Sequence, residues 1–307
     1  MIPHPSKRPR ALKPGDTLGV VAPASPFDEK SFGAGVKVLE SMGFNLHIAE
    51  DLFRRNGYLA GTDEGRADRL HRLFTDPAID GIICARGGYG AMRILPLLDA
   101  NLIARHPKAF IGFSDITALL TFLVKDCGMT TFHGPTVTTL GDADRSSRDH
   151  FYEVLTQAGP LTLISDRPRE LCGGSATGML LAGNLTLLCH LTGTPFQPDL
   201  NGCILLIEDR GEAAYRIDRM LTHMLLAGYF DGLAGVVLGS FSDCGGEEAV
   251  FRIVTDRLGK LNVPIVAGFD VGHTRSNRCL PVGEVVRLDA RTGTLRFCRP
   301  AMVPADG

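Results

Sequence analysis

The sequence predicts an α/β fold of two domains, and three observations support this prediction. The chain has 307 residues, about twice the length of an ordinary domain. Short, continuously apolar runs alternate with amphipathic segments through its first half. Hydrophobic residues make up 44 % of the chain and charged residues 21 %, so a sizeable core can form.

The first half predicts a parallel sheet covered by helices on both faces. Strands buried on both faces are continuously apolar, and the segments between these runs are amphipathic. Residues 28–42, for example, carry Phe32, Val36 and Leu39 at helical spacing. The expected strands are 17–23, 45–50, 80–85, 109–113 and 130–135, with helices at 28–42, 62–75, 90–98 and 115–126. This alternation predicts a doubly wound, flavodoxin- or Rossmann-like domain over residues 1–140.

The second half predicts a smaller domain of a different kind. Residues 141–175 are rich in polar and turn-forming residues, which favours a linker. Beyond them, apolar strands are expected around a helix, followed by a final hairpin; the segments are 203–209, 215–228, 234–241, 264–273, 284–290 and 293–297. Residues 176–307 are therefore expected to form a mixed α/β, barrel-like domain.

Bulk properties exclude several classes of function. The net charge of -2 and the lack of a lysine or arginine run argue against a nucleic-acid binder. No run approaches the ~18 apolar residues of a membrane span, and no signal peptide is expected. Eight scattered cysteines without a C-x-x-C pair predict free thiols in the cytoplasm. No metal-binding motif is present, so no metal is expected.

A glycine-rich loop follows the third predicted strand. It reads Arg86-Gly87-Gly88-Tyr89-Gly90, and ligands bind at the carboxyl ends of strands in open parallel sheets. Glycines let the backbone approach a ligand, and amides at a helix start can bind an anion or oxyanion. The loop is not a Walker motif, because no Gly-Lys-Ser/Thr follows. A simple tight turn is the alternative interpretation.

Ser114 follows the fourth predicted strand, where a helix is expected to begin. A nucleophile on a strand–helix elbow occupies such a position, and the helix N-terminus favours developing negative charge. The match to G-x-S-x-G is incomplete, because Ile116 replaces the last glycine. Serine is also a favoured N-cap residue, and on this segment alone the cap is the stronger interpretation.

A serine nucleophile needs a base, and the base needs an acid to orient it. His273 follows an apolar strand and opens a loop, while His133 at the end of the fifth strand is a minor candidate. Glu208 and Asp209 close another apolar strand. Because side chains alternate along a strand, only one of these two carboxylates is expected to serve.

With these residues in view, the chain resembles the LD-carboxypeptidase family of serine peptidases. The resemblance covers nearly the whole chain. It rests on GDTLGVVAPASP, AGTDEGRADRLHRLF, ARGGYGAMRILPLLD, IGFSDITALL, HGPTV, LAGNLTLL, LLIEDRGEAAYRIDRML and VAGFDVGHTRSNRCLPVGEVVRLD, in this order. So many motifs in one order are more specific than any single loop.

The resemblance implies a role for each candidate residue. The family's serine, histidine and glutamate match Ser114, His273 and Glu208. The family's oxyanion donors are backbone amides of the glycine-rich loop and of the residue after the serine. Here the first matches Gly87 or Gly88, and the second matches Asp115. Arg86 could pair with a substrate carboxylate, since guanidinium binds carboxylates in a bidentate way, or it could pair structurally beneath the loop.

The implied reaction is hydrolysis of the amide between the L-centre of a diamino acid and a terminal D-alanine. The implied substrate is a murein tetrapeptide released in cell-wall turnover, and the implied assembly is a homodimer without cofactors. Two alternatives stay open. One is a microcin-immunity-type peptidase that cleaves a peptidyl- or aminoacyl-nucleotide, which the lack of tryptophan weakens. The other is a non-catalytic small-molecule binding protein.

Overall fold

The first half of the chain supplies five strands of a six-stranded sheet, whose order is β12-β5-β4-β3-β1-β2. The computed structural model describes residues 7–305. The strands are β1 (Thr17–Val21), β2 (Asn45–His47), β3 (Gly81–Cys84), β4 (Ala109–Gly112), β5 (Thr131–His133) and β12 (Leu280–Val282). The first five are parallel. Their order is that of a flavodoxin-like sheet, which confirms the predicted fold class of this half.

Helices cover both faces of this sheet, as its continuously apolar strands predict. Adjacent strand residues serve opposite cores: Val20 and Ile83 pack on one side, Val21 and Ile82 on the other. The first core is covered by α1 (Glu29–Ser41), α6 (Val137–Leu140) and α7 (Arg145–Thr156). The second is covered by α2 (Asp63–Thr75), α3 (Ala91–Ile94), α4 (Ala100–Ala104) and α5 (Thr117–Lys125).

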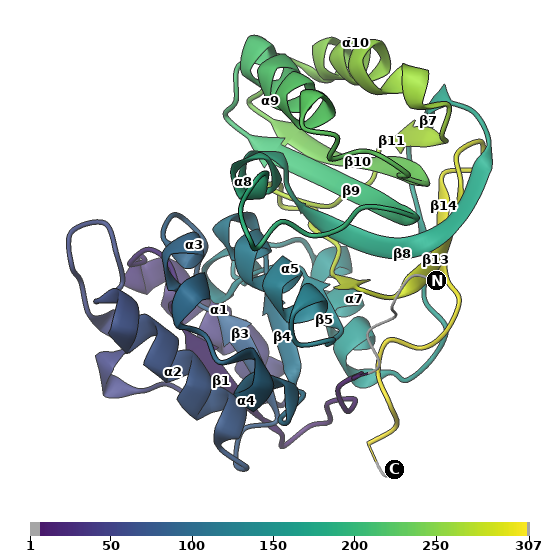
Figure 1. Cartoon of the computed structure of the whole chain (residues 1–307). Helices are drawn as coiled ribbons and strands as arrows, with labels where there is room; N and C mark the ends of the chain where they lie inside the picture. The colour runs from purple at the N-terminus through teal and green to yellow at the C-terminus, as the bar shows by residue number, and fades with distance from the viewer. Residues whose placement is uncertain (1–6, 306–307) are drawn as a thin grey trace.

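The second half forms an eight-stranded mixed sheet in the order β6-β14-β13-β8-β9-β10-β11-β7. It lies above the first sheet in Figure 1, with α9 and α10 across its outer side. The elements are β6 (Thr162–Ile164), β7 (Arg169–Cys172), β8 (Ser175–Asn184), α8 (Leu185–Leu191), β9 (Cys203–Arg210), α9 (Ala214–Leu226), β10 (Gly235–Ser242), α10 (Glu247–Leu258), β11 (Ile265–Ala267), β13 (Val285–Asp289) and β14 (Thr294–Phe297).

The two edges of this sheet are joined by a short loop. The edge strands β6 and β7 are consecutive in the chain, with residues 165–168 between them. Within that loop, Ser165 donates its N–H to Gly293 O at 2.9 Å and its hydroxyl to Gly268 O at 2.6 Å. The sheet therefore curls toward a barrel whose edges are bridged by a loop instead of a strand ladder.

Two features differ from the expected domain layout. Residues 141–175, expected to be a linker, contain α7, β6 and β7. The polar residues at their start cap α7, where the Asp144 side chain accepts from Ser147 N at 2.7 Å. In addition, β12 comes from the second half but pairs with β5 in the first sheet. The domain division at residues 140 and 176 stays a prediction.

Contacts between the two halves bring their sheets together at the strand ends. The N–H of Asn184, at the end of β8, donates to Thr117 Oγ1 at the start of α5 at 2.9 Å. Thr130 donates to the fully buried Glu284 at 2.6 Å. Over residues 7–305, no helix combines the length and apolar character needed to cross a membrane. All eight cysteines are free thiols.

Candidate active site

Ser114 lies on a strained elbow between β4 and α5. Its φ of +65° is in the left-handed region, which non-glycine residues rarely occupy. It opens a short 3-10 turn, η3 (Ser114–Ile116), whose N-cap residue is Phe113 and which has no side-chain cap. The Ser114 hydroxyl instead contacts His273. The structure therefore supports the elbow interpretation of this serine over the helix-cap interpretation.

His273 connects Ser114 to Glu208. Its Nε2 lies 3.0 Å from Ser114 Oγ, and its Nδ1 lies 2.6 Å from Glu208 Oε2. Gly272, with a φ of +122°, makes this approach possible, because a Cβ there would lie 2.5 Å from Glu208 Oε2. The hydroxyl of Ser242 donates to His273 O at 3.0 Å and holds the loop from the side of β10. The three predicted residues thus form one hydrogen-bonded chain across both halves.

The adjacent carboxylates of β9 have separate tasks. Glu208 is fully buried and contacts His273. Asp209 accepts from the N–H and hydroxyl of Thr186 at 2.9 and 2.8 Å, which caps the start of α8. Asn184 Nδ2 donates to Asp209 Oδ1 at 2.8 Å and lies 3.4 Å from Glu208 Oε1. The structure therefore brings Glu208, and not Asp209, to the histidine.

Burial and pairing shift the proton affinities of this pair. Burial of the imidazole acts to lower the pKa of His273, but the hydrogen bond and negative charge of Glu208 outweigh it, so that this pKa is raised above its ordinary value. Burial also raises the pKa of Glu208, and the hydrogen bond with His273 opposes this effect. A fully buried carboxylate beside the imidazole favours the protonated form of His273 when it accepts a proton.

Two segments that supply candidate oxyanion donors lie beside Ser114. In the glycine-rich loop, the N–H groups of Gly87 and Gly88 donate to no acceptor within residues 7–305. Gly88 has a φ of +107°, and a Cβ there would lie 2.6 Å from Ser25 Oγ. Ser25 Oγ accepts the N–H of Tyr89 at 2.9 Å and so holds the loop. The other segment is Asp115, the residue after the nucleophile candidate.

The remaining candidates, Arg86 and His133, lie outside the hydrogen-bonded chain of Ser114, His273 and Glu208. Arg86 is exposed and donates to Pro26 O at 2.9 Å. His133 is fully buried behind Phe113, whose ring centroid lies 5.9 Å from His133 and 4.8 Å from His273. Neither ring nitrogen of His133 has a partner within the described chain. Burial, together with the nearby His273, lowers the pKa of His133 to about 3, so it stays neutral.

Asn184, which the sequence pattern does not single out, contacts both carboxylates of β9. Asn184 also caps α8, since its Oδ1 accepts from Leu187 N at 3.2 Å. An asparagine before an apolar helix is a recognisable cap signal, but its contacts with a strand 24 residues away in the chain leave no local signal. Among the described residues, no cluster of three or more His, Cys, Asp or Glu could hold a metal ion.

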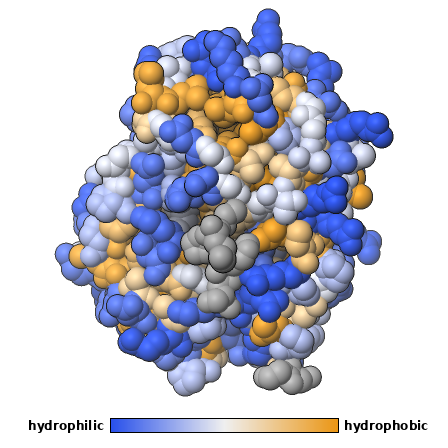
Figure 2. Space-filling model, turned by 45° about the vertical axis from the view of Figure 1, so that its right-hand side comes forward, coloured by the Kyte–Doolittle hydropathy of each residue, from blue (hydrophilic) through white to orange (hydrophobic). Residues whose placement is uncertain are grey.

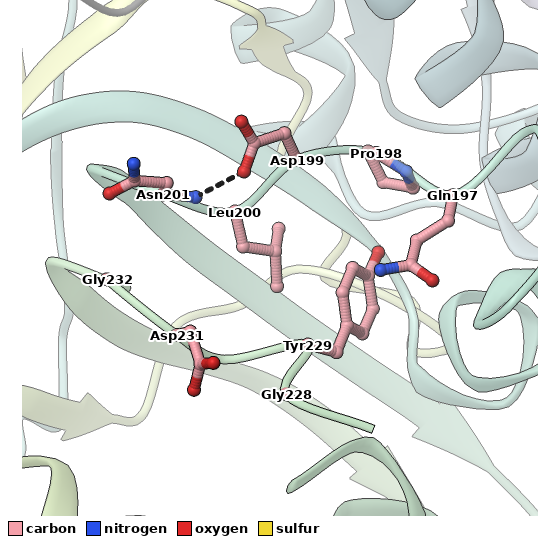
Figure 3. Close-up of a pocket in the computed structure, with 9 residues that line it drawn as sticks. All are labelled: Gln197, Pro198, Asp199, Leu200, Asn201, Gly228, Tyr229, Asp231 and Gly232. Carbon is pink, nitrogen blue, oxygen red and sulfur yellow. Dashed lines mark hydrogen bonds between the residues drawn. The ribbon is translucent and has the colours of Figure 1, made fainter. Parts of the chain in front are cut away.

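A concavity of about 350 Å³ lies away from this site. It is lined by residues 197–201, 228, 229, 231 and 232, which precede β9 and β10, whereas Glu208 lies at the other end of β9. Figure 3 shows the ring of Tyr229 directed toward Gln197 and the hydrogen bond between Asn201 N and Asp199. This concavity is therefore separate from the candidate active site.

A serine joined through histidine to a buried carboxylate at the strand ends is an arrangement found in serine hydrolases. The chain belongs to the LD-carboxypeptidase family. The model of the family's N-terminal domain matches residues 18–134, and that of its C-terminal domain matches residues 177–288. The chain is therefore a carboxypeptidase of this family.

Individual proteins of this family resemble the whole chain. A murein tetrapeptide carboxypeptidase of Pseudomonas aeruginosa is 34% identical, over 89% of this chain and 92% of the relative. The microcin C7 self-immunity protein of Escherichia coli is 31% identical, over 91% of this chain and 92% of the relative. The crystal structure of a muramoyltetrapeptide carboxypeptidase from Oxalobacter formigenes is similar with a TM-score of 0.81 and 30% identity, covering 92% of this chain and 97% of that one.

Proposed function

We propose that this carboxypeptidase removes the terminal D-alanine from murein tetrapeptides, hydrolysing the amide that joins it to the L-centre of a diamino acid. The observation that carries the proposal is the chain of contacts from Ser114 Oγ to His273 Nε2 at 3.0 Å and from His273 Nδ1 to Glu208 Oε2 at 2.6 Å. The relatives named for murein and muramoyl tetrapeptides support the choice of substrate.

In the proposed reaction, His273 takes the hydroxyl proton of Ser114 as its Oγ attacks the scissile carbonyl. Glu208 holds the imidazole through Nδ1 and stabilises its positive charge. The amides of Gly87 or Gly88 and of Asp115 bind the oxyanion. His273 then gives the proton to the departing amine of D-alanine. Water attacks the acyl-enzyme by the same route and releases the shortened peptide.

Arg86 is our proposed partner for the terminal carboxylate of the substrate. It is exposed at the start of the glycine-rich loop, and its bond to Pro26 O uses Nη1 of the guanidinium. A carboxypeptidase must recognise the free carboxylate at the end of its substrate, and a guanidinium can do so through two N–H groups. Arg86→Gln should then raise KM and leave kcat within a few-fold of the wild type; an unchanged KM would contradict this role.

The test of the proposed function is incubation with muropeptides that carry tri-, tetra- and pentapeptide stems, followed by mass spectrometry. We expect the tetrapeptide to lose one D-alanine, while the tripeptide stays intact. Ser114→Ala, checked for an unchanged fold by circular dichroism, should release none. Turnover retained by this variant would refute Ser114 as the nucleophile.

A second candidate function is cleavage of a peptidyl- or aminoacyl-nucleotide. The 31% identical microcin self-immunity protein favours it. The chain has no tryptophan to stack on a nucleobase, which favours the murein peptide instead. Parallel assays with a tetrapeptide and an aminoacyl-nucleotide separate the two. A non-catalytic binding protein would cleave neither substrate and would leave Ser114 unlabelled by a fluorophosphonate.

We also propose a cytoplasmic homodimer that acts on free peptides and binds neither nucleic acid nor membrane. The eight free thiols suit a reducing compartment. Figure 2 shows apolar side chains gathered over the upper, C-terminal domain on one face, which could pack against a second copy. Light scattering coupled to size-exclusion chromatography should give twice the mass of the 33.0 kDa chain. A monomer at micromolar concentration would contradict the dimer.

A further inference from the structure

A buried arginine contacts the end of the glycine-rich loop. Arg66, on α2, has no exposed surface. Its Nη1 donates to the backbone oxygens of Pro23 and Gly90, at 2.8 Å for Gly90, and its Nη2 pairs with Asp63. Burying a guanidinium is unfavourable unless its donors find partners. Arg66 thus links the loop that follows β1 to the loop that follows β3.

Gly90 is shaped to receive this arginine. It has a φ of +121°, a conformation that favours glycine. A Cβ at this position would lie 2.5 Å from Leu59 Cδ2 and 3.1 Å from Arg66 Nη1. Any other side chain would therefore be strained in its backbone and would displace Leu59, Arg66 or the loop itself. The end of the loop and Arg66 are therefore in close contact, through both this packing and the hydrogen bond to Gly90 O.

The side chain of Asp115 holds the residue that follows the glycine-rich loop. Its Oδ2 accepts the N–H of Ala91, directly after the loop, at 2.8 Å, and this bond is buried. Burial raises the pKa of Asp115, while the Ala91 N–H and the charge of Arg66 act in the opposite direction. Since Asp115 follows Ser114, this hydrogen bond ties the elbow to the glycine-rich loop.

We propose that Arg66 and the carboxylate of Asp115 are positioning residues, which hold the Gly87–Gly88 segment against Ser114 and so fix the separation of the two oxyanion donors. This inference rests on the proposed function. Neither group touches the reacting atoms. The donors act on charge that develops in the transition state, so a displaced Gly87–Gly88 segment should lower kcat by a larger factor than it raises KM.

The first test compares Arg66→Met with Arg69→Met. Arg69 is a matched control because it lies on the same helix, is only 5% exposed, and contacts Ala60 O and Asp51 instead of the glycine-rich loop. Per folded molecule, Arg66→Met should lose about 10²-fold in kcat, comparable to the loss of one oxyanion donor. Arg69→Met should stay within a few-fold of the wild type. Equal kcat losses in the two variants would overturn the role of Arg66.

The second test asks whether the oxygen acceptor of Asp115 matters. Asp115→Ala removes the acceptor, whereas Asp115→Asn keeps an oxygen that can accept from Ala91 N. We expect Asn to recover at least tenfold in kcat over Ala, with thermal unfolding measured in parallel. Equal kcat values for the two variants, both folded, would overturn the role of this carboxylate.

A third readout separates this inference from the proposed substrate. A fluorophosphonate reacts with an activated serine whichever peptide the enzyme cleaves, and intact mass records the adduct on Ser114. Slower labelling in Arg66→Met than in Arg69→Met supports the positioning role even if no D-alanine is released from a tetrapeptide. Equal labelling rates in the two variants would refute the positioning role. A wild-type protein that releases no D-alanine from the tetrapeptide would instead refute the proposed function.

Discussion

Gly87 lies directly against Ser114. A Cβ at position 87 would come within 2.9 Å of Ser114 Cβ and 3.1 Å of Ser114 Oγ. The absence of a side chain there lets the glycine-rich loop reach the elbow and leaves the Ser114 hydroxyl free to contact His273. This contact places the two segments that carry the predicted oxyanion donors, Gly87–Gly88 and Asp115, next to each other.

Gly87→Ala is therefore expected to push the loop away from Ser114. The rate of D-alanine release should fall by about 10²-fold or more, as for a lost oxyanion donor. Gly33→Ala is the control, because a Cβ at this position in α1 would meet no atom within 4 Å. Steady-state kinetics and thermal unfolding of both variants check this, and an active Gly87→Ala enzyme would contradict it.

Glu208→Gln should mainly impair catalysis, whereas Asp209→Asn should mainly lower stability. The first removes the charge that stabilises the His273 imidazolium, so kcat should fall by about 10³–10⁴-fold. The second disturbs the cap of α8, which should cost about 1–3 kcal/mol of unfolding free energy and affect kcat much less. Kinetics and urea unfolding measure the two quantities. A larger kcat loss in Asp209→Asn would mean that Asp209 is the orienting acid.

The pH profile should report the raised pKa of His273. The imidazole must be neutral to accept the Ser114 proton, so kcat/KM should rise with pH through that pKa, with its acidic limb above 6.5. In Glu208→Gln, the hydrogen bond to a charged partner is lost while burial still lowers the pKa, so the limb should move to lower pH. A limb that does not move would argue against the coupling of His273 to Glu208.

The strained backbone of Ser114 makes a prediction about stability. At an ordinary site, glycine is less stable than alanine by about 0.5–1 kcal/mol. At a φ of +65°, alanine is strained and glycine is not, so Ser114→Gly should be at least as stable as Ser114→Ala. Neither should release D-alanine. Urea unfolding compares the two, and a clearly more stable alanine variant would contradict the strain.

The N-terminal sheet and the three residues of the hydrogen-bonded chain could be predicted because they follow local rules. Continuous apolar runs marked β1, β3 and β4, and polar residues just after apolar strands marked Ser114, Glu208 and His273. The local pattern favours Ser114 as a helix cap. The direction of its hydroxyl depends on tertiary contacts, so only the family resemblance and the distant His273 indicate a nucleophile.

What local rules could not predict depends on long-range contacts. Arg66 lies in a segment so rich in charge that it resembles a solvated helix face, yet it is fully buried. Its partners Pro23 and Gly90 are distant in sequence. The pairing of β12 with β5 joins segments of different halves and leaves no periodic signal. The polar residues at the start of α7 also suit a linker, because helix caps and loops share residue types.

The sixth strand of the first sheet, β12, also affects the order in which the fold can form during synthesis. Leu280–Val282 are synthesised long after Thr131–His133, and until then the β5 edge has no partner on that side. Glu208 and His273 also emerge long after Ser114. A nascent chain therefore carries Ser114 without its partner, and the hydrogen-bonded chain can form only after His273 has been synthesised.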